Sequence, residues 1–254
     1  MNIKSQLKKI GFVKQMLAAR YNRLKAQGFK RDLQQFNESA GNTVKRFDGI
    51  LNIEPHLNDK SSITVIEPHY TYHPAWAARV IAKNRPQKHT DISSILHFST
   101  IISAFVPTDF YDYRPATVKL ENYASKQADL TRLPFESGSI GSLSCMHTIE
   151  HIGLGRYGDP IDYDGDLKAI TELKRVLAPG GSLLIVTPIG KAKIVFNAHR
   201  IYSYEQIISY FSDLELIEFS LIPDHYVQDG IINHASKELA DQQNWGCGCF
   251  HFKK

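Results

Sequence analysis

The stretch LKRVLAPGGSLLIVTP, residues 173–188, decides the fold because it joins the end of a helix to a strand. Upstream of the proline, apolar residues recur at helical spacing and share one face, as in a helix packed on a core. These residues are Leu167, Ile170, Leu173, Val176 and Leu177. Pro179, Gly180 and Gly181 then end the helix. The segment predicts a helix over 166–178, followed by a buried strand over 182–188.

Short runs rich in β-branched and aromatic residues alternate with helical patterns on both sides of this segment. Upstream runs lie at 89–92, 109–113 and 141–146, and later ones at 214–222 and 247–252. The alternation is typical of βαβ units and of a mostly parallel sheet. We expect the last strand to be antiparallel. A helix from residue 74 is expected to end at Arg85, because proline follows it.

The composition fits one large α/β domain with an appendage: 254 residues, 43% hydrophobic and 22% charged. No run approaches the roughly 18 consecutive apolar residues that cross a bilayer, and no secretion signal is recognisable. The expected location is therefore the cytoplasm. The three cysteines, Cys145, Cys247 and Cys249, are too few for a disulfide framework and are expected to be reduced.

The first 31 residues hold nine lysines and arginines and no acidic residue. Ile3, Ile10, Leu17 and Leu24 recur every seventh residue, which predicts a basic amphipathic helix. Its apolar stripe could dock on the chain's own domain or on a sister subunit in a homo-oligomer, or lie on anionic lipid as a peripheral membrane contact. Nucleic-acid binding is not expected, because no aromatic-rich basic surface accompanies the helix. We expect residues 1–60 to form the helix and a connector, the connector covering residues 32–60 with Gly41 and Asn42, and residues 61–254 to form the main domain.

Two blocks of sequence carry a family resemblance. PFESGSIGSLSCMHTIEHI (134–152), followed by ELKRVLAPGGSLLIVTP (172–188), resembles class I S-adenosylmethionine-dependent methyltransferases. The resemblance implies a Rossmann-like fold with a mostly parallel seven-stranded sheet and helices on both faces. The longer stretch 69–254, including EHIGLGRYGDPIDYDGDLKAI and NWGCGCF, is similar to a bacterial family of unknown function grouped with those enzymes.

That resemblance assigns the first cofactor contacts to the end of the first strand, at Asp91, Ser93 and Ser94. Methyltransferases usually have an acidic residue there, followed by a Gly-x-Gly turn. Glycine allows positive φ and a close approach of backbone to ligand. Serine makes such a turn at some cost, and its β-carbon narrows the space. Asp91 could instead be a helix N-cap.

The resemblance places further cofactor contacts after the next strands. Asp112 ends the second strand, where an acid accepts the ribose hydroxyls. Asp129 and Leu130 match the segment after the third strand, where the aspartate accepts from the adenine amino group. His147 ends the fourth strand and completes the set. Asp112 could alternatively form a turn with Arg114.

His147, Glu150 and His151 form the pattern H-x-x-E-H at the carboxyl end of the fourth strand. A helix beginning near residue 148 would place all three on one face. His199, after the fifth strand, could join them. Three interpretations stay open: His151 or His199 as general base, a divalent-metal site, or structural histidines. A metallopeptidase is disfavoured, because the motif follows a buried strand and runs into glycines.

Two other motifs have simpler interpretations. Gly153, Gly155 and Gly158 spell G-x-G-x-x-G, but they do not follow the first strand or open a helix, so they indicate a flexible lid over the substrate rather than a dinucleotide site. Asp164 or Asp166 is expected to cap the next helix. The C-x-C-x-H pattern formed by Cys247, Cys249 and His251 could bind a metal, but alternating positions of a strand face one side of a sheet, and a buried strand with small residues explains the pattern as well.

The leading hypothesis is an S-adenosylmethionine-dependent O-methyltransferase for a hydroxyl of a small molecule or sugar, with His151, Glu150 and His199 as catalytic residues. A role in surface polysaccharide synthesis follows only from the resemblance. The first alternative keeps the fold but binds a nucleotide-sugar or runs other chemistry, metal-dependent chemistry included, at the histidines. The second is a non-catalytic partner protein that docks through its basic helix.

Overall fold

The structure is a computed structural model that describes residues 3–40 and 52–254. By its internal contacts the chain divides into two compact units, Met1–Val65 and Ile66–Lys254. Gly41 and Asn42, which the sequence assigns to the connector, lie outside the described residues, as do the side chains of Ile3 and Ile10.

The first unit contains one long helix, α1 (Ile3–Ala40). A helix was expected here, but it continues through residues assigned to the connector, because no proline or glycine interrupts residues 29–40. Within this unit Leu17, Tyr21 and Leu24 are exposed. Among the described residues, no helix combines the length and apolar character that crossing a membrane requires.

The second unit is built on one eight-stranded sheet with the order β3-β2-β1-β4-β5-β10-β8-β9. In chain order its strands are β1 (His89–Ile92), β2 (Thr108–Asp112), β3 (Tyr123–Gln127), β4 (Ile140–Met146), β5 (Leu177–Ile189), β8 (Glu215–Ile222), β9 (Ile232–Asn233) and β10 (Gly246–Lys253). Strands β1 to β5 pair in parallel. β10 is antiparallel to both of its neighbours, as expected.

The sheet confirms the predicted Rossmann-like α/β architecture and differs from it in two details. The eighth strand, β9, has two residues and pairs only with the edge of β8. The predicted helix over 166–178 ends earlier, because Leu177 already pairs with Ile140 of β4 and so belongs to β5. The strand therefore passes through Pro179 and both glycines before it enters the core.

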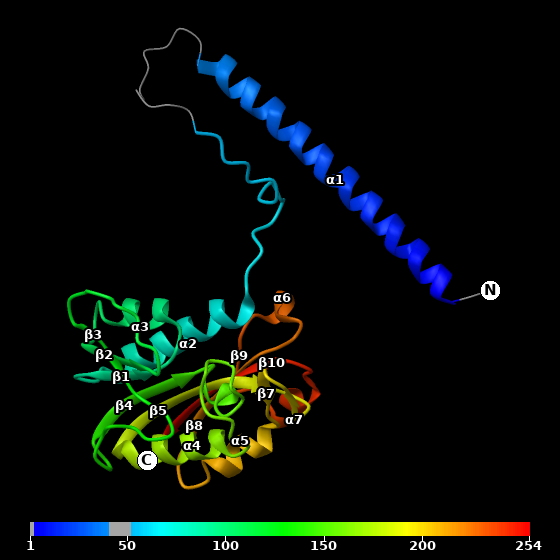
Figure 1. Cartoon of the computed structure of the whole chain (residues 1–254). Helices are drawn as coiled ribbons and strands as arrows, with labels where there is room; N and C mark the ends of the chain where they lie inside the picture. Colours follow the sequence, from blue (N-terminus) through cyan, green and yellow to red (C-terminus); the bar gives the residue numbers. More distant parts are fainter. Residues whose placement is uncertain (1–2, 41–51) are drawn as a thin grey trace. The chain divides into compact units, whose positions relative to one another are not determined.

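Helices cover both faces of the sheet (Figure 1). The sheet thus divides the apolar core into two clusters, one on each face. On one face α2 (Pro68–Asn84) and α3 (Leu96–Ile102) contribute Trp76 and Phe98. On the other, α4 (Gly165–Val176) and α5 (Tyr204–Tyr210) contribute Ile170 and Ile207. Burial of these apolar side chains is the main force that holds the layers together.

Helix α2 begins six residues before the predicted start at residue 74. Glu67 caps it by accepting a 2.6 Å hydrogen bond from the backbone N–H of Tyr70, and Pro68 occupies its first turn, where a missing N–H costs nothing. The helix ends at Asn84 with Arg85 as its C-cap, as expected. The longer α2 brings His69 and His73 into the core.

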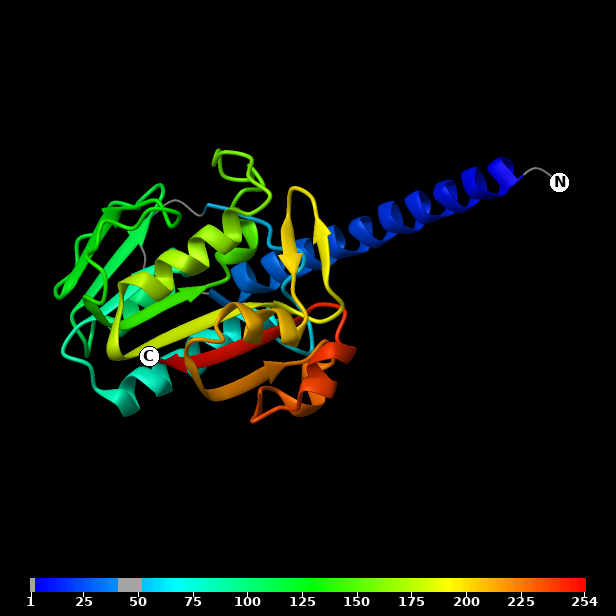
Figure 2. The ribbon, with the colours of Figure 1, turned by 90° about the horizontal axis from the view of Figure 1, so that it is seen from below.

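Short elements complete the edge of the domain at the carboxyl ends of the parallel strands. The hairpin of β6 (Lys193–Val195) and β7 (His199–Ile201) projects from the sheet and is yellow in Figure 2. A 3-10 turn, η1 (Ile149–His151), follows β4. Helices α6 (Tyr226–Asp229) and α7 (Lys237–Gln242) flank β9.

Candidate functional site

A cavity of about 450 Å³ opens at the carboxyl ends of β1, β2, β3 and β4. Open α/β sheets bind ligands at this edge, and the volume falls within the range of about 300–1,000 Å³ typical of small-molecule sites. Of the residues expected from the sequence, six contribute to its lining: Ser93, Asp112, Asp129, Leu130, His147 and His151. Asp91, Ser94, Glu150 and His199 are not part of the lining.

Ser93 adopts the backbone conformation that glycine usually has at this position in the methyltransferases that the sequence resembles. Its φ is 55°, in the left-handed region that costs an L-residue roughly 1–2 kcal/mol. Three contacts hold the turn: the N–H and Oγ of Ser93 both donate to Tyr111 O, at 2.7 and 3.2 Å, and Thr148 Oγ1 donates to Ser93 O at 3.0 Å. The serine-containing loop therefore keeps the tight turn expected of a glycine-containing one.

Asp91 and Ser94 lie beneath this turn. The Ser94 hydroxyl donates to Asp91 Oδ1 at 2.6 Å and accepts from Met146 N at 3.1 Å, and the Ser144 hydroxyl also donates to Asp91 Oδ1. Complete burial raises the pKa of Asp91 to about 7, against the opposing effect of these hydrogen bonds. Both residues thus support the loop from inside, and α3 has no side-chain cap from Asp91.

Asp112 and Asp129 face the cavity from the ends of β2 and β3. Asp112 Oδ1 accepts from the Arg114 N–H at 2.7 Å, the turn contact anticipated as an alternative. Asp129 Oδ1 accepts from the N–H and the hydroxyl of Thr131, at 2.8 and 2.7 Å. In both carboxylates Oδ2 has no hydrogen-bond partner within the described part of the chain, so each retains an acceptor for a ligand.

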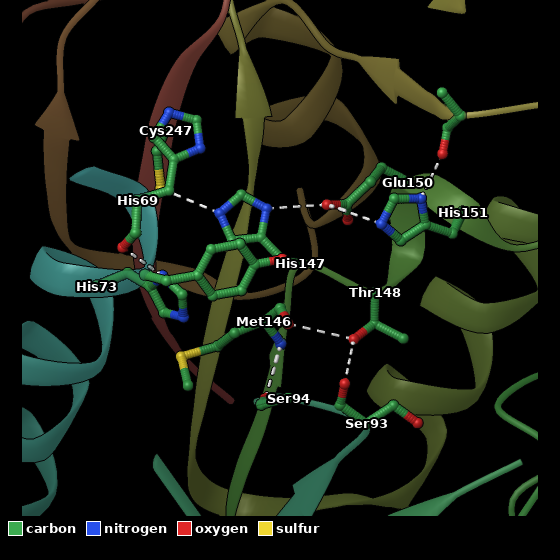
Figure 3. A network of polar contacts seen from close by, with 12 residues as sticks. His69, His73, Ser93, Ser94, Met146, His147, Thr148, Glu150, His151 and Cys247 are labelled. Atoms are coloured by element: carbon green, nitrogen blue, oxygen red, sulfur yellow. Dashed lines mark hydrogen bonds and ion pairs between the residues drawn. The ribbon is translucent and has the colours of Figure 1, made fainter. Parts of the chain in front are cut away.

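His147, Glu150 and His151 come together as predicted, but Glu150 and His151 lie on the 3-10 turn η1 rather than on an α-helix, and His147 lies two residues before it. His147 Nδ1 lies 2.9 Å from Glu150 Oε1, and the same oxygen is 3.8 Å from His151 Nε2 (Figure 3). Glu150 is only 1% exposed, and its Oε2 has no hydrogen-bond partner in the described structure. Glu150 therefore links the two imidazoles from a buried position.

His151 and His199 differ in their relation to the cavity. His151 Nδ1 lies 2.6 Å from the carbonyl oxygen of Ala198, and its ring lines the cavity. His199 stacks on Trp245 and meets His151 edge to face at 6.5 Å between ring centroids. Burial lowers the pKa of both imidazoles, while Glu150 opposes the shift, so both favour the neutral form.

Sequence reasoning missed a cluster around His147. His69 stacks on His147 with 5.3 Å between ring centroids, and Cys247 Sγ lies 3.5 Å from His147 Nε2. Burial, followed by the neighbouring His147, lowers the pKa of His69 to about 4. The His69/His73 spacing in EPHYTYHP and the cysteine at 247 were the available signals, but they lie 178 residues apart and only the fold joins His69 to Cys247.

The glycine-rich loop after η1, which the sequence assigns to a flexible lid over the substrate, forms one wall of the cavity. Asp159 Oδ2 accepts from the N–H groups of Gly153 and Gly155, at 2.8 and 3.4 Å, and Asp162 N donates to Gly153 O at 3.0 Å. Gly153 has φ 81°, and a β-carbon there would lie 2.0 Å from Asp162 O. The glycine is needed for close packing of this loop.

The two aspartates expected to cap α4 have different roles. Asp164 occupies the N-cap position without a side-chain capping bond. Asp166 lies 3.4 Å from the Arg200 guanidinium and accepts from the Tyr202 hydroxyl at 2.8 Å. Because Arg200 also donates to Ile152 O at 2.7 Å, this buried pair ties the β6–β7 hairpin to the cavity wall.

Comparison with known protein families gives a match without a function. Residues 111–229 match the model of a family described as Caenorhabditis protein of unknown function, DUF268. The description names Caenorhabditis, whereas the sequence resemblance suggested a bacterial family. No curated protein sequence matches the chain.

Solved structures give a clearer answer on the fold. The N-methyltransferase NodS from Bradyrhizobium japonicum WM9, in complex with S-adenosylhomocysteine, has a TM-score of 0.51 at 13% identity, over 80% of this chain and 93% of that chain. The 1,6-didemethyltoxoflavin-N1-methyltransferase from Burkholderia thailandensis, with 1,6-didemethyltoxoflavin and S-adenosylhomocysteine bound, has a TM-score of 0.51 at 9% identity, over 73% of this chain and 80% of that chain. The chain therefore has the Rossmann-like fold of class I S-adenosylmethionine-dependent methyltransferases.

Proposed function

We propose that the protein is an S-adenosylmethionine-dependent O-methyltransferase that acts on a hydroxyl group of a small molecule or sugar. The observation that carries the proposal is the cavity at the carboxyl edge of the sheet, where an acceptor carboxylate at the end of β2 and a neutral imidazole after β4 line one space. The fold supports S-adenosylmethionine as the methyl donor, and the imidazole supports removal of the proton from the acceptor hydroxyl.

The residues around the cavity fit a nucleoside. Asp112 and Asp129 each hold one oxygen in a local turn and keep the other for the ribose hydroxyls and the adenine amino group, respectively. Leu130 and Ala128 supply apolar surface beside them. Ser93 lines the cavity and keeps the left-handed turn at this position. When bound, S-adenosylmethionine supplies an electrophilic methyl group.

His151 is the residue best suited to remove the acceptor proton. The carbonyl oxygen of Ala198 can only accept, so the 2.6 Å contact places the His151 proton on Nδ1 and leaves Nε2 as the basic nitrogen. Arg156 Nη1, which could only donate to Nδ1, is farther away at 3.4 Å. A lowered pKa keeps that nitrogen unprotonated at neutral pH. Glu150 Oε1, 3.8 Å away, stabilises the positive charge that proton transfer creates.

The same cavity includes polar side chains suited to a hydroxylated acceptor. Tyr157 closes one wall, with the guanidinium groups of Arg114 and Arg156 each 5.1 Å from its ring. Lys168, on α4, also lines the cavity and pairs with Asp162. These groups can position a sugar or a small polar molecule beside His151. A role in polysaccharide synthesis would follow if the acceptor is a sugar.

Calorimetry on the full chain with S-adenosylhomocysteine tests the donor half of the proposal. We expect micromolar binding that Asp112→Ala weakens at least tenfold. Asp109→Ala is the matched control, because Asp109 lies on the same strand but pairs with Lys88 and Lys126 outside the cavity. Failure to bind at millimolar ligand would refute the proposal and favour a nucleotide-sugar or a purely structural role for the fold.

A further inference from the structure

Three side chains that commonly ligate metals meet beside the cavity, on the side of His147 away from Glu150 (Figure 3). They come from three elements: His69 from the first turn of α2, His147 from the end of β4, and Cys247 from the start of β10. The ligand atoms of all three lie within 4.8 Å of one another. No other described group of His, Cys, Asp and Glu side chains meets this spacing.

Two of the three ligand atoms are already spaced as they would be around a zinc ion. Cys247 Sγ and His147 Nε2 are 3.5 Å apart. A tetrahedral zinc ion with Zn–S of about 2.3 Å and Zn–N of about 2.0 Å holds sulfur and nitrogen about 3.5 Å apart. The His69 ligand atom lies within 4.8 Å of the other two, and a side-chain adjustment would bring it to the spacing of roughly 3.3–3.5 Å between ligand atoms that one tetrahedral ion requires.

Glu150 prepares His147 as a ligand. A carboxylate oxygen accepts and cannot donate, so its 2.9 Å contact places the imidazole proton on Nδ1. The lone pair of Nε2 is then directed toward Cys247. Metal-bound histidines usually donate their other N–H to a carboxylate in this way, which fixes the tautomer and the ring orientation.

Charge balance also favours a dication. Cys247 is fully buried, and the Glu150 Oε2 atom is buried with no partner in the described structure. A buried carboxylate is costly unless a positive group compensates it, even when one of its oxygens is hydrogen-bonded. A divalent ion bound to the Cys247 thiolate would cancel both negative charges within one small region. Nitrogen and sulfur ligands select zinc over magnesium or calcium.

We propose that His69, His147 and Cys247 bind a zinc-class divalent cation, with a water molecule as the fourth ligand. This site differs from the metal group suggested by the sequence, because His151 and His199 are not part of it. It extends beyond methyl transfer and does not depend on it. Because its three ligands come from α2, the end of β4 and β10, the bound ion would join these elements next to the cavity.

The test uses the full chain, stripped with a chelator and reloaded with Zn²⁺ or Co²⁺. We expect one metal ion per chain by elemental analysis, and a thiolate-to-cobalt charge-transfer absorption band in the Co²⁺ form. Cys247→Ala should lose the band and bind metal at least 100-fold more weakly. Cys145→Ala, at a buried cysteine of the other core cluster, should keep both properties. Glu150→Gln should weaken binding about 10- to 100-fold.

Thermal unfolding provides a second measurement, because an ion that binds only the folded state raises the midpoint. Zn²⁺ should raise it for the wild type and Cys145→Ala but not for Cys247→Ala. If Cys247→Ala does not fold, His69→Gln supplies the same comparison. The proposal is overturned if the wild type shows no bound metal and no cobalt band, or if the variants of both ligands retain them. Binding of S-adenosylhomocysteine to the metal-free protein is measured separately, so its failure would refute only the proposed methyl transfer.

Discussion

His151 donates a 2.6 Å hydrogen bond from Nδ1 to the carbonyl oxygen of Ala198, which lies in the turn of the β6–β7 hairpin. The Ala198 N–H in turn donates to Val195 O at 2.7 Å, so the hairpin holds this carbonyl in place. The tautomer of the proposed base is therefore set by a segment 47 residues farther along the chain.

Replacement of His151 by alanine should reduce the rate of methyl transfer about 100- to 10,000-fold, the range expected for loss of a general base. Affinity for S-adenosylhomocysteine should change little, because Asp112 and Asp129 remain. His199→Ala is the comparison, with a smaller loss expected since His199 does not line the cavity. Steady-state kinetics and calorimetry separate the two effects. Equal losses in both variants would contradict the assignment.

The pH dependence of transfer should reflect the lowered pKa of His151. A base acts only when deprotonated, so the rate should rise with pH through a midpoint below the ordinary histidine value of about 6.5 and then level off. Glu150→Gln removes the charge that opposes this lowering and should move the midpoint to still lower pH. Rate profiles of both proteins between pH 4 and 8 test the order of the two midpoints. A midpoint above 7 in the wild type would exclude His151 as the general base.

Ser93→Gly should increase the free energy of unfolding by about 1 kcal/mol, since glycine adopts φ 55° without the steric cost of a β-carbon. Ser94→Gly is the matched control and should destabilise, because its hydroxyl bonds both Asp91 and Met146. Urea unfolding of the three proteins gives the comparison. Destabilisation by Ser93→Gly would show that its hydroxyl contact with Tyr111 outweighs the backbone strain.

Asp91 should make stability decrease as pH rises from about 4 to about 7. The unfolded chain loses this proton near the ordinary carboxyl value, whereas the folded chain retains it until about 7. Protons are therefore released on unfolding in this window, and the folded state loses a few kcal/mol relative to the unfolded state. Asp91→Asn keeps an acceptor for Ser94 and Ser144 and should remove this decline. The difference between the two unfolding curves across pH is the measured quantity.

Asp109→Asn provides a control of opposite sign. Lys88 and Lys126 hold the pKa of Asp109 below its usual value, despite the opposing effect of partial burial. The ion pairs of Asp109 stabilise the wild-type fold above the ordinary carboxyl pKa. This stabilisation is lost as pH falls through the lower pKa that Asp109 has in the folded state. A variant without the carboxylate should thus differ from wild type near neutral pH and converge with it in acid. A parallel response of both aspartates would contradict the assigned pKa directions.

Much of the fold could be predicted from local patterns. The apolar period of three to four residues located α4, and the uninterrupted apolar run located β5, because each pattern reports which side of an element faces the core. The start of α2 was missed, because its cap and its proline lie in a polar stretch that also resembles a turn. The end of α4 was misplaced by two residues, because pairing of Leu177 with Ile140 outweighed helix propensity.

The sequence by itself determined that a parallel sheet would bring Ser93, Asp112 and His147 to one edge, since successive parallel strands end on the same side. Only the tertiary structure decided which nitrogen of His151 is basic, and that His69 and Cys247 lie beside His147. Those relationships join residues from separate elements, and no local periodicity records how α2, the β6–β7 hairpin and an antiparallel last strand pack around the end of β4.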